Sequence, residues 1–289
     1  RYNQKEFKRN ADVLVVYDTK VFYHLAHNWV IDVISHTGVE WATIDLFKSG
    51  TTSDFCYLFD LKNINLDKYK VVLFANTFLM SDEERDYIKT HVAGGGRTII
   101  WNYMPGYSNG QSLNERFVKE LVQMDIKRIK LKNKPPEIVM QKNPGETFGV
   151  ISKHKPFFDF EIQPPTYSIW NNEPPVYVIN EKDAIILARY KKDNEPAIGW
   201  KTLKDWNSVF CSLPLQNPTI MREIFRKAGC HIYTENGDVI HDGGGILVIH
   251  TAKEGKRDVK LRNGKTLSLD LKKNSTVLLD SDTGEILLD

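Results

Sequence analysis

The chain has 289 residues, of which 41% are hydrophobic, 11% aromatic and 26% charged, an ordinary globular composition with room for two domains. Its 39 basic and 37 acidic residues give a formal net charge of +2, which argues against nucleic acid or an anionic membrane as partner. The basic block 127–134 contains alternating Ile and Leu, so we interpret it as a strand with one solvated face. No apolar run approaches the roughly 18 residues that span a membrane.

The three cysteines, Cys56, Cys211 and Cys230, cannot all pair within the chain, and none has metal-ligand spacing. We therefore expect buried free thiols and predict no metal and no cofactor. The compartment stays open, with a secreted or periplasmic bacterial protein as one option. The chain begins at Arg1 without Met, which suggests a processed protein or an excised fragment, and residues 1–10 are expected to be a linker from an upstream domain.

The first part of the chain predicts alternating strands and helices. Residues 12–17 are an apolar strand that ends at Asp18, and an amphipathic helix with Ala26, Val30 and Val33 follows, closed by Gly38. A second strand is predicted over 41–46. The connection 48–67 gives mixed signals.

The stretch 69–107 predicts a strand, a helix and a second strand. Residues 71–74 and 98–101 are continuous apolar runs, typical of strands covered on both faces. Ser81 and Glu84 form a capping box that starts the helix, and the three glycines at 94–96 end it. A further helix is expected from Leu113 to near Met124. This order favours a doubly wound parallel sheet of flavodoxin or amidotransferase type, an α/β fold.

The region 126–196 changes in character. Three Pro-Pro pairs separate short apolar pieces without helical period, which predicts irregular strands and loops laid over the α/β domain. Residues 184–190 and 207–213 are again clear strands. Asn217 and Pro218 then start a helix that ends at Gly229.

After Gly229 the pattern is all β. Strands are predicted over 245–250, 276–279 and 285–288, and the Asn263-Gly264 pair predicts a hairpin between two alternating segments. We therefore expect an α/β domain over 11–230, with the insertion at 126–196, and a small antiparallel β-sandwich over 231–289.

Ligands of open α/β sheets bind beyond the carboxyl ends of the strands, so any site is expected after Tyr17, Phe74 or Trp101. Hydrolases of this architecture place a Ser or Cys at such a bend. Here the bends carry Asn76 with Thr77, and Asn102 with Tyr103, so no nucleophile is present and no catalytic residue is assigned.

Other possible sites are weaker. The glycines at 94–96 and 243–245 precede strands rather than helices, so turns are expected instead of phosphate cradles. His24 and His27 share a helix face but lack a third metal ligand. Asp18 and Asp45 lie at predicted strand ends, where a carboxylate serves as a cap more often than as a catalyst.

Aromatic residues gather at two predicted strand ends. Phe22 and Tyr23 follow Asp18, whereas Tyr103 and Tyr107 follow Trp101 on a Pro-Gly loop. Aromatic rings stack on sugars and anchor protein interfaces, although Trp101 itself is expected in the core. The candidates for a ligand or an interface are therefore Asp18, Phe22, Tyr23, Asn76, Tyr103 and Tyr107.

The segment ADVLVVYD from Ala11, together with the strand, Ser-x-x-Glu helix, Ala-Gly-Gly-Gly and strand of 69–107, resembles the trimerisation domain of family-42 β-galactosidases. That domain is similar to class I glutamine amidotransferases without their nucleophile. The stretch 201–229 resembles the end of the same domain, and the tail from His231 resembles the small β domain that closes such enzymes.

The resemblance implies a C-terminal portion of a glycoside hydrolase whose catalytic barrel lies upstream. It also implies self-association as a dimer or trimer, with the loop from Thr19 to Tyr23 placed to wall a neighbour's carbohydrate site. The family pattern tends to carry Trp in that loop, where this chain has Phe22 and Tyr23.

Two other functions stay open. One is a stand-alone amidotransferase-like or trehalose-utilisation-like hydrolase that uses Asp18, His24 or Asn76 at the strand ends. The other is a carbohydrate-binding module, which would need a row of exposed aromatics on the tail, where the sequence offers Tyr233.

Overall fold

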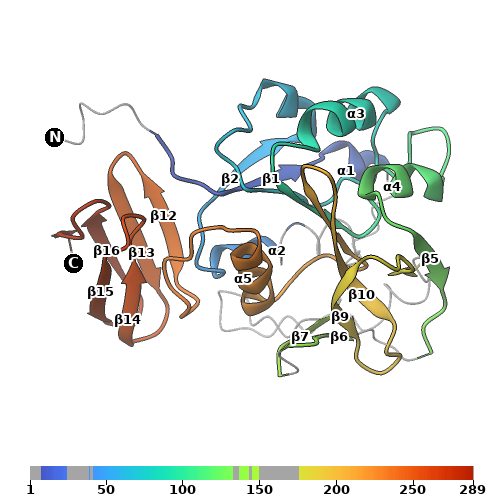
Figure 1. Ribbon diagram of the computed structural model, residues 1–289. Coiled ribbons are helices and arrows are strands. Elements are labelled where there is room, and N and C mark those ends of the chain that lie inside the picture. The colour runs from blue at the N-terminus through green and yellow to red at the C-terminus, as the bar shows by residue number, and fades with distance from the viewer. Residues whose placement is uncertain are drawn as a thin grey trace.

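The computed structural model describes residues 8–24, 39, 42–132, 137–142, 145–149 and 176–288. Two apolar cores are present in this part of the chain. The first takes residues from Ala11 to Cys230, and the second takes residues from Tyr233 to Leu279. Figure 1 shows the strands of the second core beside the α/β part. None of the helices described is long and apolar enough to cross a membrane.

The first core contains helices on a mixed sheet. The helical segments are α1 (Lys20–His24), α2 (Ala42–Phe47), the 3₁₀ segment η3 (Leu58–Asn63), α3 (Asp82–Tyr87), its π-helical continuation η4 (Ile88–Val92), α4 (Glu115–Val122) and α5 (Pro218–Lys227). The strands are β1 (Val13–Tyr17), β2 (Ser53–Tyr57), β3 (Val71–Phe74), β4 (Thr98–Asn102), β5 (Ile126–Ile129), β6 (Glu137–Met140), β7 (Thr147–Gly149), β8 (Val176–Ile179), β9 (Ile185–Tyr190), β10 (Pro196–Thr202) and β11 (Asn207–Cys211).

The main sheet has nine strands in the order β2-β1-β3-β4-β11-β10-β9-β6-β7. The pairs from β2 to β11 are parallel, and the pairs from β11 to β7 are antiparallel. The structure is therefore an α/β fold, as the alternation of elements predicted, but its sheet is mixed and not parallel throughout, because β10, β9, β6 and β7 add antiparallel pairs. Because β1, β3, β4 and β11 run in parallel, their carboxyl ends meet at one edge of the sheet.

The central unit agrees with the prediction. Both bonds of the capping box form: the Glu84 amide donates to Ser81 Oγ at 3.2 Å, and the Ser81 amide donates to Glu84 Oε2 at 2.8 Å. The turn after η4 uses left-handed glycines, with φ of 65° at Gly95 and 73° at Gly96. The helix therefore ends where the glycines predict, and β4 follows as a fully buried strand.

The prediction of a strand over 41–46 was wrong, because residues 42–47 form α2. Its buried residues Ala42, Asp45 and Leu46 share one helix face, and α2 packs against α5. The second strand of the sheet is instead β2, inside the connection that gave mixed signals. As the last strand of the sheet in the described residues, β2 has half-buried Asp54 and Cys56 alternating with exposed Phe55 and Tyr57. The predicted helix over 26–38 lies outside the described residues.

The region 126–196 is more regular than expected. β6, β7 and β9 extend the main sheet, so these segments are not simply laid over it, and β10, which the sequence did not predict, joins them to β11. β5 pairs with β8 in a separate two-stranded sheet. Lys127 and Arg128 of β5 are both exposed, and because consecutive strand residues point to opposite faces, the expected alternation with one solvated face is not found there. The predicted strands at 184–190 and 207–213 are confirmed as β9 and β11.

The tail is all β, as predicted. Its strands are β12 (Val239–Gly243), β13 (Ile246–Thr251), β14 (Gly255–Lys260), β15 (Thr266–Leu271), β16 (Ser275–Asp280) and β17 (Ile286–Leu288). β12, β13, β16 and β17 form one sheet, and the β14–β15 hairpin turns at Asn263-Gly264. Both sheets contribute side chains to the second core, in the manner of a small sandwich.

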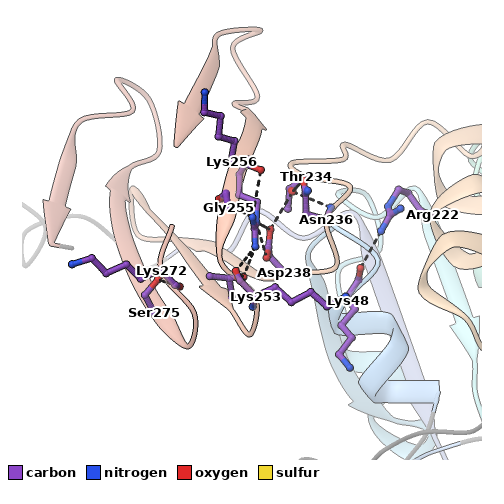
Figure 2. A network of polar contacts seen from close by, with 12 residues as sticks. Lys48, Arg222, Thr234, Asn236, Asp238, Lys253, Gly255, Lys256, Lys272 and Ser275 are labelled. Atoms are coloured by element: carbon purple, nitrogen blue, oxygen red, sulfur yellow. Dashed lines mark hydrogen bonds and ion pairs between the residues drawn. The ribbon is translucent and has the colours of Figure 1, made fainter. Parts of the chain in front are cut away.

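A buried ion pair lies inside the tail. Arg257 donates from Nε to Asp238 Oδ2 at 3.0 Å, and only 4% and 2% of the two side chains are exposed. The two terminal nitrogens of the same guanidinium also donate hydrogen bonds. Nη1 donates to the Gly255 carbonyl at 2.8 Å, and Nη2 donates to Thr251 Oγ1 at 2.7 Å and to the Lys253 carbonyl. Figure 2 shows Asp238, Lys253 and Gly255 gathered in this network.

Candidate functional site

The carboxyl ends of β1 and β3 are joined by two hydrogen bonds. The Asp18 amide donates to Asn76 Oδ1 at 2.8 Å, and Asn76 Nδ2 donates to the Asp18 carbonyl at 2.9 Å. Both residues are buried. The sequence placed Asp18 and Asn76 at one edge, and the structure brings them into contact. The Asn76 amide therefore acts as a brace between two strand ends.

The Asp18 carboxylate is only partly satisfied. Its Oδ1 accepts the Lys20 amide at 3.1 Å, which starts α1, whereas its buried Oδ2 has no hydrogen-bond partner. Burial raises the pKa of Asp18 to about 6, against the lowering effect of the Lys20 amide and ammonium, and the Glu84 carboxylate raises it further. Asp18 is thus the strand-end group whose charge state changes near neutral pH.

An ion pair joins the two helices that begin beside Asp18. Lys20 Nζ of α1 lies 2.7 Å from Glu84 Oε1 and 2.9 Å from Glu84 Oε2. Glu84 also closes the capping box of α3, so one carboxylate serves two helix starts. The sequence showed the capping box but gave no sign of its link to Lys20.

The bend after β4 begins with a residue in the left-handed backbone region. Tyr103 has φ of 54°, a conformation that costs free energy for a residue other than glycine. Its side chain is only 5% exposed, and burial raises the pKa of its phenol. The bend after β4 therefore holds a buried aromatic ring.

The loop after β11 covers the same strand ends. The Leu215 amide donates to Asn102 Oδ1 at 3.1 Å, and Asn102 Nδ2 is buried without a partner. The hollow between these elements measures about 10 Å³, room for about one water molecule. It is lined by Ala75, Asn76, Phe78, Asn102, Tyr103, Met104 and Pro214. At this size the hollow does not admit a sugar or an amide substrate.

The predicted aromatic candidates separate into exposed and packed residues. Tyr23 on α1 is 91% exposed and Phe22 is 41% exposed. Tyr107 is half-buried and packs edge-on against Phe78 at 5.5 Å and tilted against Tyr177 at 6.2 Å between ring centroids. Only the pair after β1 presents aromatic surface outward among these candidates.

The other possible sites gain no support from the described residues. Asp45 lies on α2, not at a strand end, and its Oδ2 accepts the Asn217 amide at 2.8 Å at the start of α5. Across the described part of the chain, no three His, Cys, Asp or Glu side chains are grouped to hold a metal ion. The His24 side chain and His27 lie outside the described residues.

The three cysteines are free thiols. Burial raises the pKa of Cys56 to about 12 and also raises the pKa values of Cys211 and Cys230. Thiols with raised pKa values are poor nucleophiles at neutral pH. The structure thus agrees with the sequence that none of them has the setting of a catalytic cysteine.

The tail carries a shallow polar groove of about 530 Å³. It is lined by Glu235, Asn236, Lys256, Asp258, Lys260 and Ser268, of which all are exposed. Tyr233, the aromatic that the sequence offered for sugar binding on the tail, is only 1% exposed. The groove is therefore a solvated surface of mixed charge without a stacking platform.

Solved structures with the same fold are β-galactosidases. The enzyme from Bacillus circulans sp. alkalophilus matches with a TM-score of 0.60 at 15% identity, over 93% of this chain and 41% of that chain. The enzyme from Rahnella sp. R3 matches with a TM-score of 0.63 at 10% identity, over 94% and 41%. The GH42 enzyme Gan42B from G. stearothermophilus matches with a TM-score of 0.60 at 13% identity, over 94% and 40%.

These identities are low, so the matches show a shared fold. The chain spans about two fifths of the length of these enzymes, 40% to 41%. No protein-family model matches the sequence. No curated protein matches it either. The resemblance to family-42 β-galactosidases is thus supported at the level of the fold, across nearly the whole chain.

Proposed function

We propose that this chain is the non-catalytic C-terminal portion of a β-galactosidase-like glycoside hydrolase, which serves self-association and shapes a carbohydrate site. The observation that carries the proposal is the strand-end edge itself. In open α/β sheets this edge holds the reacting groups. Here Asn76 braces it, Tyr103 stands in place of a nucleophile, and the hollow that the described residues form beside Asn76 and Asn102, about 10 Å³, is too small for a substrate.

The fold supports the same proposal. The parallel strands follow the order β2-β1-β3-β4-β11, which is the flavodoxin-like order of doubly wound folds. We infer the amidotransferase-like relationship from this order and from the bend at Tyr103. We also propose that the chain divides into a unit over 11–230 and a tail over 231–289, because the two apolar cores separate between Cys230 and Tyr233.

The loop after β1 is the proposed contact surface. Tyr23 is almost fully exposed on a short helix whose start is fixed by Asp18 and whose Lys20 is tied to α3. A rigidly held, exposed aromatic residue can anchor a protein interface or stack on a sugar ring at low entropic cost. Phe22 beside it widens this surface.

The proposal is tested by the molar mass of the chain in solution, measured by light scattering over a concentration series. A dimer or trimer is expected for the natural sequence, and Tyr23→Ser is expected to shift it toward monomer. Ile185→Ser is the control, because Ile185 is a 55% exposed hydrophobic residue on β9, which four strands separate from β1 in the sheet. A strict monomer at all concentrations would contradict the self-association, and hydrolysis of a galactoside by this chain would contradict the non-catalytic role.

A second candidate, a hydrolase in its own right, is favoured by one observation. Asp18 combines a buried, unpartnered oxygen with a pKa of about 6, as general acids and bases do. Asp18→Asn separates the two functions. Loss of a hydrolytic rate in this variant would support the second candidate, whereas unchanged self-association without any hydrolytic rate agrees with the first.

A further inference from the structure

The segment that leads into β1 is also paired with the tail sheet. The Asn10 amide donates to the Asp242 carbonyl at 3.0 Å, and the Gly244 amide donates to the Lys8 carbonyl at 3.0 Å. Arg9 forms an antiparallel bridge with Gly243 between them. Because β12 is the outer strand of its sheet, these bonds add a short strand to a free edge. Figure 1 shows this segment passing the tail on its way to β1.

The same segment is tied to the α/β unit. Thr52 Oγ1 donates to the Asn10 carbonyl at 2.5 Å, and the Asp12 carbonyl accepts the Lys70 amide at 2.9 Å and the Val71 amide at 3.1 Å. Residues 8–12 therefore connect the edge of the tail sheet with the amino end of the parallel sheet. Each unit holds this segment through backbone hydrogen bonds.

Arg262, in the β14–β15 turn, fixes the segment from the tail side. Its Nη2 donates to the Asn10 carbonyl at 2.8 Å, and its Nη1 donates to Asp12 Oδ1 at 3.1 Å. Its Nε donates to Tyr233 Oη at 2.7 Å, and that hydroxyl donates to Asp242 Oδ2 at 2.5 Å. One guanidinium thus spans the segment, the start of the tail and β12.

The two units also meet through their backbones. The Tyr233 amide donates to the Gly50 carbonyl at 2.8 Å, and the His231 amide donates to Asp12 Oδ2 at 2.6 Å. Gly50 has φ of 85°, and a Cβ at this position would lie 1.9 Å from the Thr234 carbonyl oxygen. No side chain fits there, so the approach of the two chains depends on glycine.

We propose that residues 8–12 are a coupling strap, which makes the α/β unit and the tail unfold together in one cooperative transition. Arg262 is the residue that positions this strap. In this role, the edge of β12 binds residues 8–10 and so fixes the direction in which this segment leads into β1. This role rests on the junction alone and does not depend on self-association or on carbohydrate binding.

The test uses hydrogen exchange on the full chain, read at the amides of β12 and β13 and compared with those of β3 and β4. All six tryptophans lie at or before Trp206, so tryptophan fluorescence reports unfolding of the α/β unit alone. In the natural sequence we expect the tail amides to become exposed in the same denaturant range as the fluorescence change. Tail amides that exchange at much lower denaturant would overturn the proposal at once.

Two matched pairs of variants sharpen the test. In the first pair, Asn10→Pro removes the backbone amide that donates to β12, whereas Asn10→Ala keeps this amide. In the second pair, Arg262→Gln removes the guanidinium that bonds Asn10 and Asp12, whereas the control Arg226→Gln removes an exposed ion pair to Glu235 across the same junction. We expect Asn10→Pro and Arg262→Gln to speed tail exchange about tenfold or more over their controls, with β3 and β4 unchanged.

If Arg262→Gln fails to fold, Asn10→Pro still decides the matter, because Asn10 lies outside both apolar cores. Equal tail exchange in Asn10→Pro and Asn10→Ala would overturn the coupling role of the strap. An Arg226→Gln variant as fast as Arg262→Gln would overturn the positioning role of Arg262.

Discussion

Among the described residues that bury charge, Arg257 with Asp238 in the tail and Asp18 at the strand ends form a contrast. In the tail, the donors of Arg257 meet Asp238, a hydroxyl and backbone carbonyls, so the buried cation is neutralised and hydrogen-bonded (Figure 2). At the strand ends, Asp18 bonds one backbone amide with one oxygen and leaves the other without a partner. A paired buried charge stabilises a specific arrangement, whereas an unpaired one costs free energy in its ionised form.

The difference separates a structural group from a potentially functional one. Asp238 has its counterion within 3.0 Å and holds two tail strands together through Arg257. Asp18 retains a raised pKa at the edge where this class of fold places its ligands. Of the two buried acids compared here, Asp18 is therefore the one whose protonation changes with the pH of the solution near neutrality.

The largest effect is expected when the tail ion pair is broken. Arg257→Met leaves the Asp238 carboxylate buried without a counterion and should destabilise the tail by about 3–5 kcal/mol. The free energy of unfolding, followed by hydrogen exchange at β13, measures this. Arg257→Met combined with Asp238→Leu should recover much of the loss. If Arg257→Met alone were as stable as the natural chain, Arg257 would not be neutralising the buried Asp238 carboxylate as described here.

The brace between β1 and β3 comes next. Asn76→Ala removes both bonds to the Asp18 backbone and leaves a buried amide and a buried carbonyl unpaired, at a cost of about 2–4 kcal/mol. Urea denaturation followed by tryptophan fluorescence gives the value. Asn109→Ala, in an exposed turn, is the control, with a change of about 0.5 kcal/mol. A stable Asn76→Ala variant that loses activity or binding would mark Asn76 as a functional group instead.

Replacing the partly unpaired carboxylate of Asp18 should change the free energy of unfolding less, and it should stabilise the protein instead of destabilising it. Because burial raises the pKa of Asp18 from 3.8 to about 6, the folded state binds this proton more tightly, and stability falls as pH rises through that window. Asp18→Asn keeps an oxygen for the Lys20 amide and should be about 1–2 kcal/mol more stable at pH 8, allowing for partial solvation. Urea midpoints at pH 4 and pH 8 test this, since the gain should vanish at pH 4.

The smallest effect is expected at an exposed ion pair. Arg226 contacts Glu235 at 2.8 Å with both side chains largely in solvent, so Arg226→Gln should change the free energy of unfolding by about 0.5 kcal/mol or less. Thermal unfolding at low and high salt measures it. A larger, salt-resistant loss would mean that the junction between the two units depends on surface charge as much as on buried bonds.

Local sequence signals predicted the central unit accurately. The capping box at Ser81, the glycines after η4 and the Asn217-Pro218 start of α5 all act within a few residues, and each is found where predicted. The same holds for the Asn263-Gly264 hairpin. The prediction of a strand over 41–46 failed, because residues 42–47 form a helix that packs against α5.

The candidate site was predictable in place but not in character. The sequence placed Asp18 and Asn76 after two strands of a parallel sheet, and the structure joins them by hydrogen bonds. The hydrogen bonds of these residues, the loop at Leu215 that covers the strand ends and the burial of Tyr103 all depend on contacts between separate segments. Asn102 and Leu215, which are hydrogen-bonded, are more than 100 residues apart in the sequence. No local pattern carries such information.

The sequence by itself determined the α/β class, the all-β tail, the lack of Ser and Cys at the bends after Phe74 and Trp101, and the caps and turns that bound the elements. Each of these depends on neighbouring residues or on residue type alone. Only the tertiary structure decided that the hollow beside Asn76 and Asn102 has room for about one water molecule, that Asp18 keeps an unpaired oxygen, and that residues 8–12 join the two units. Those properties arise from distant segments packed together, where burial rather than local propensity sets the free energy.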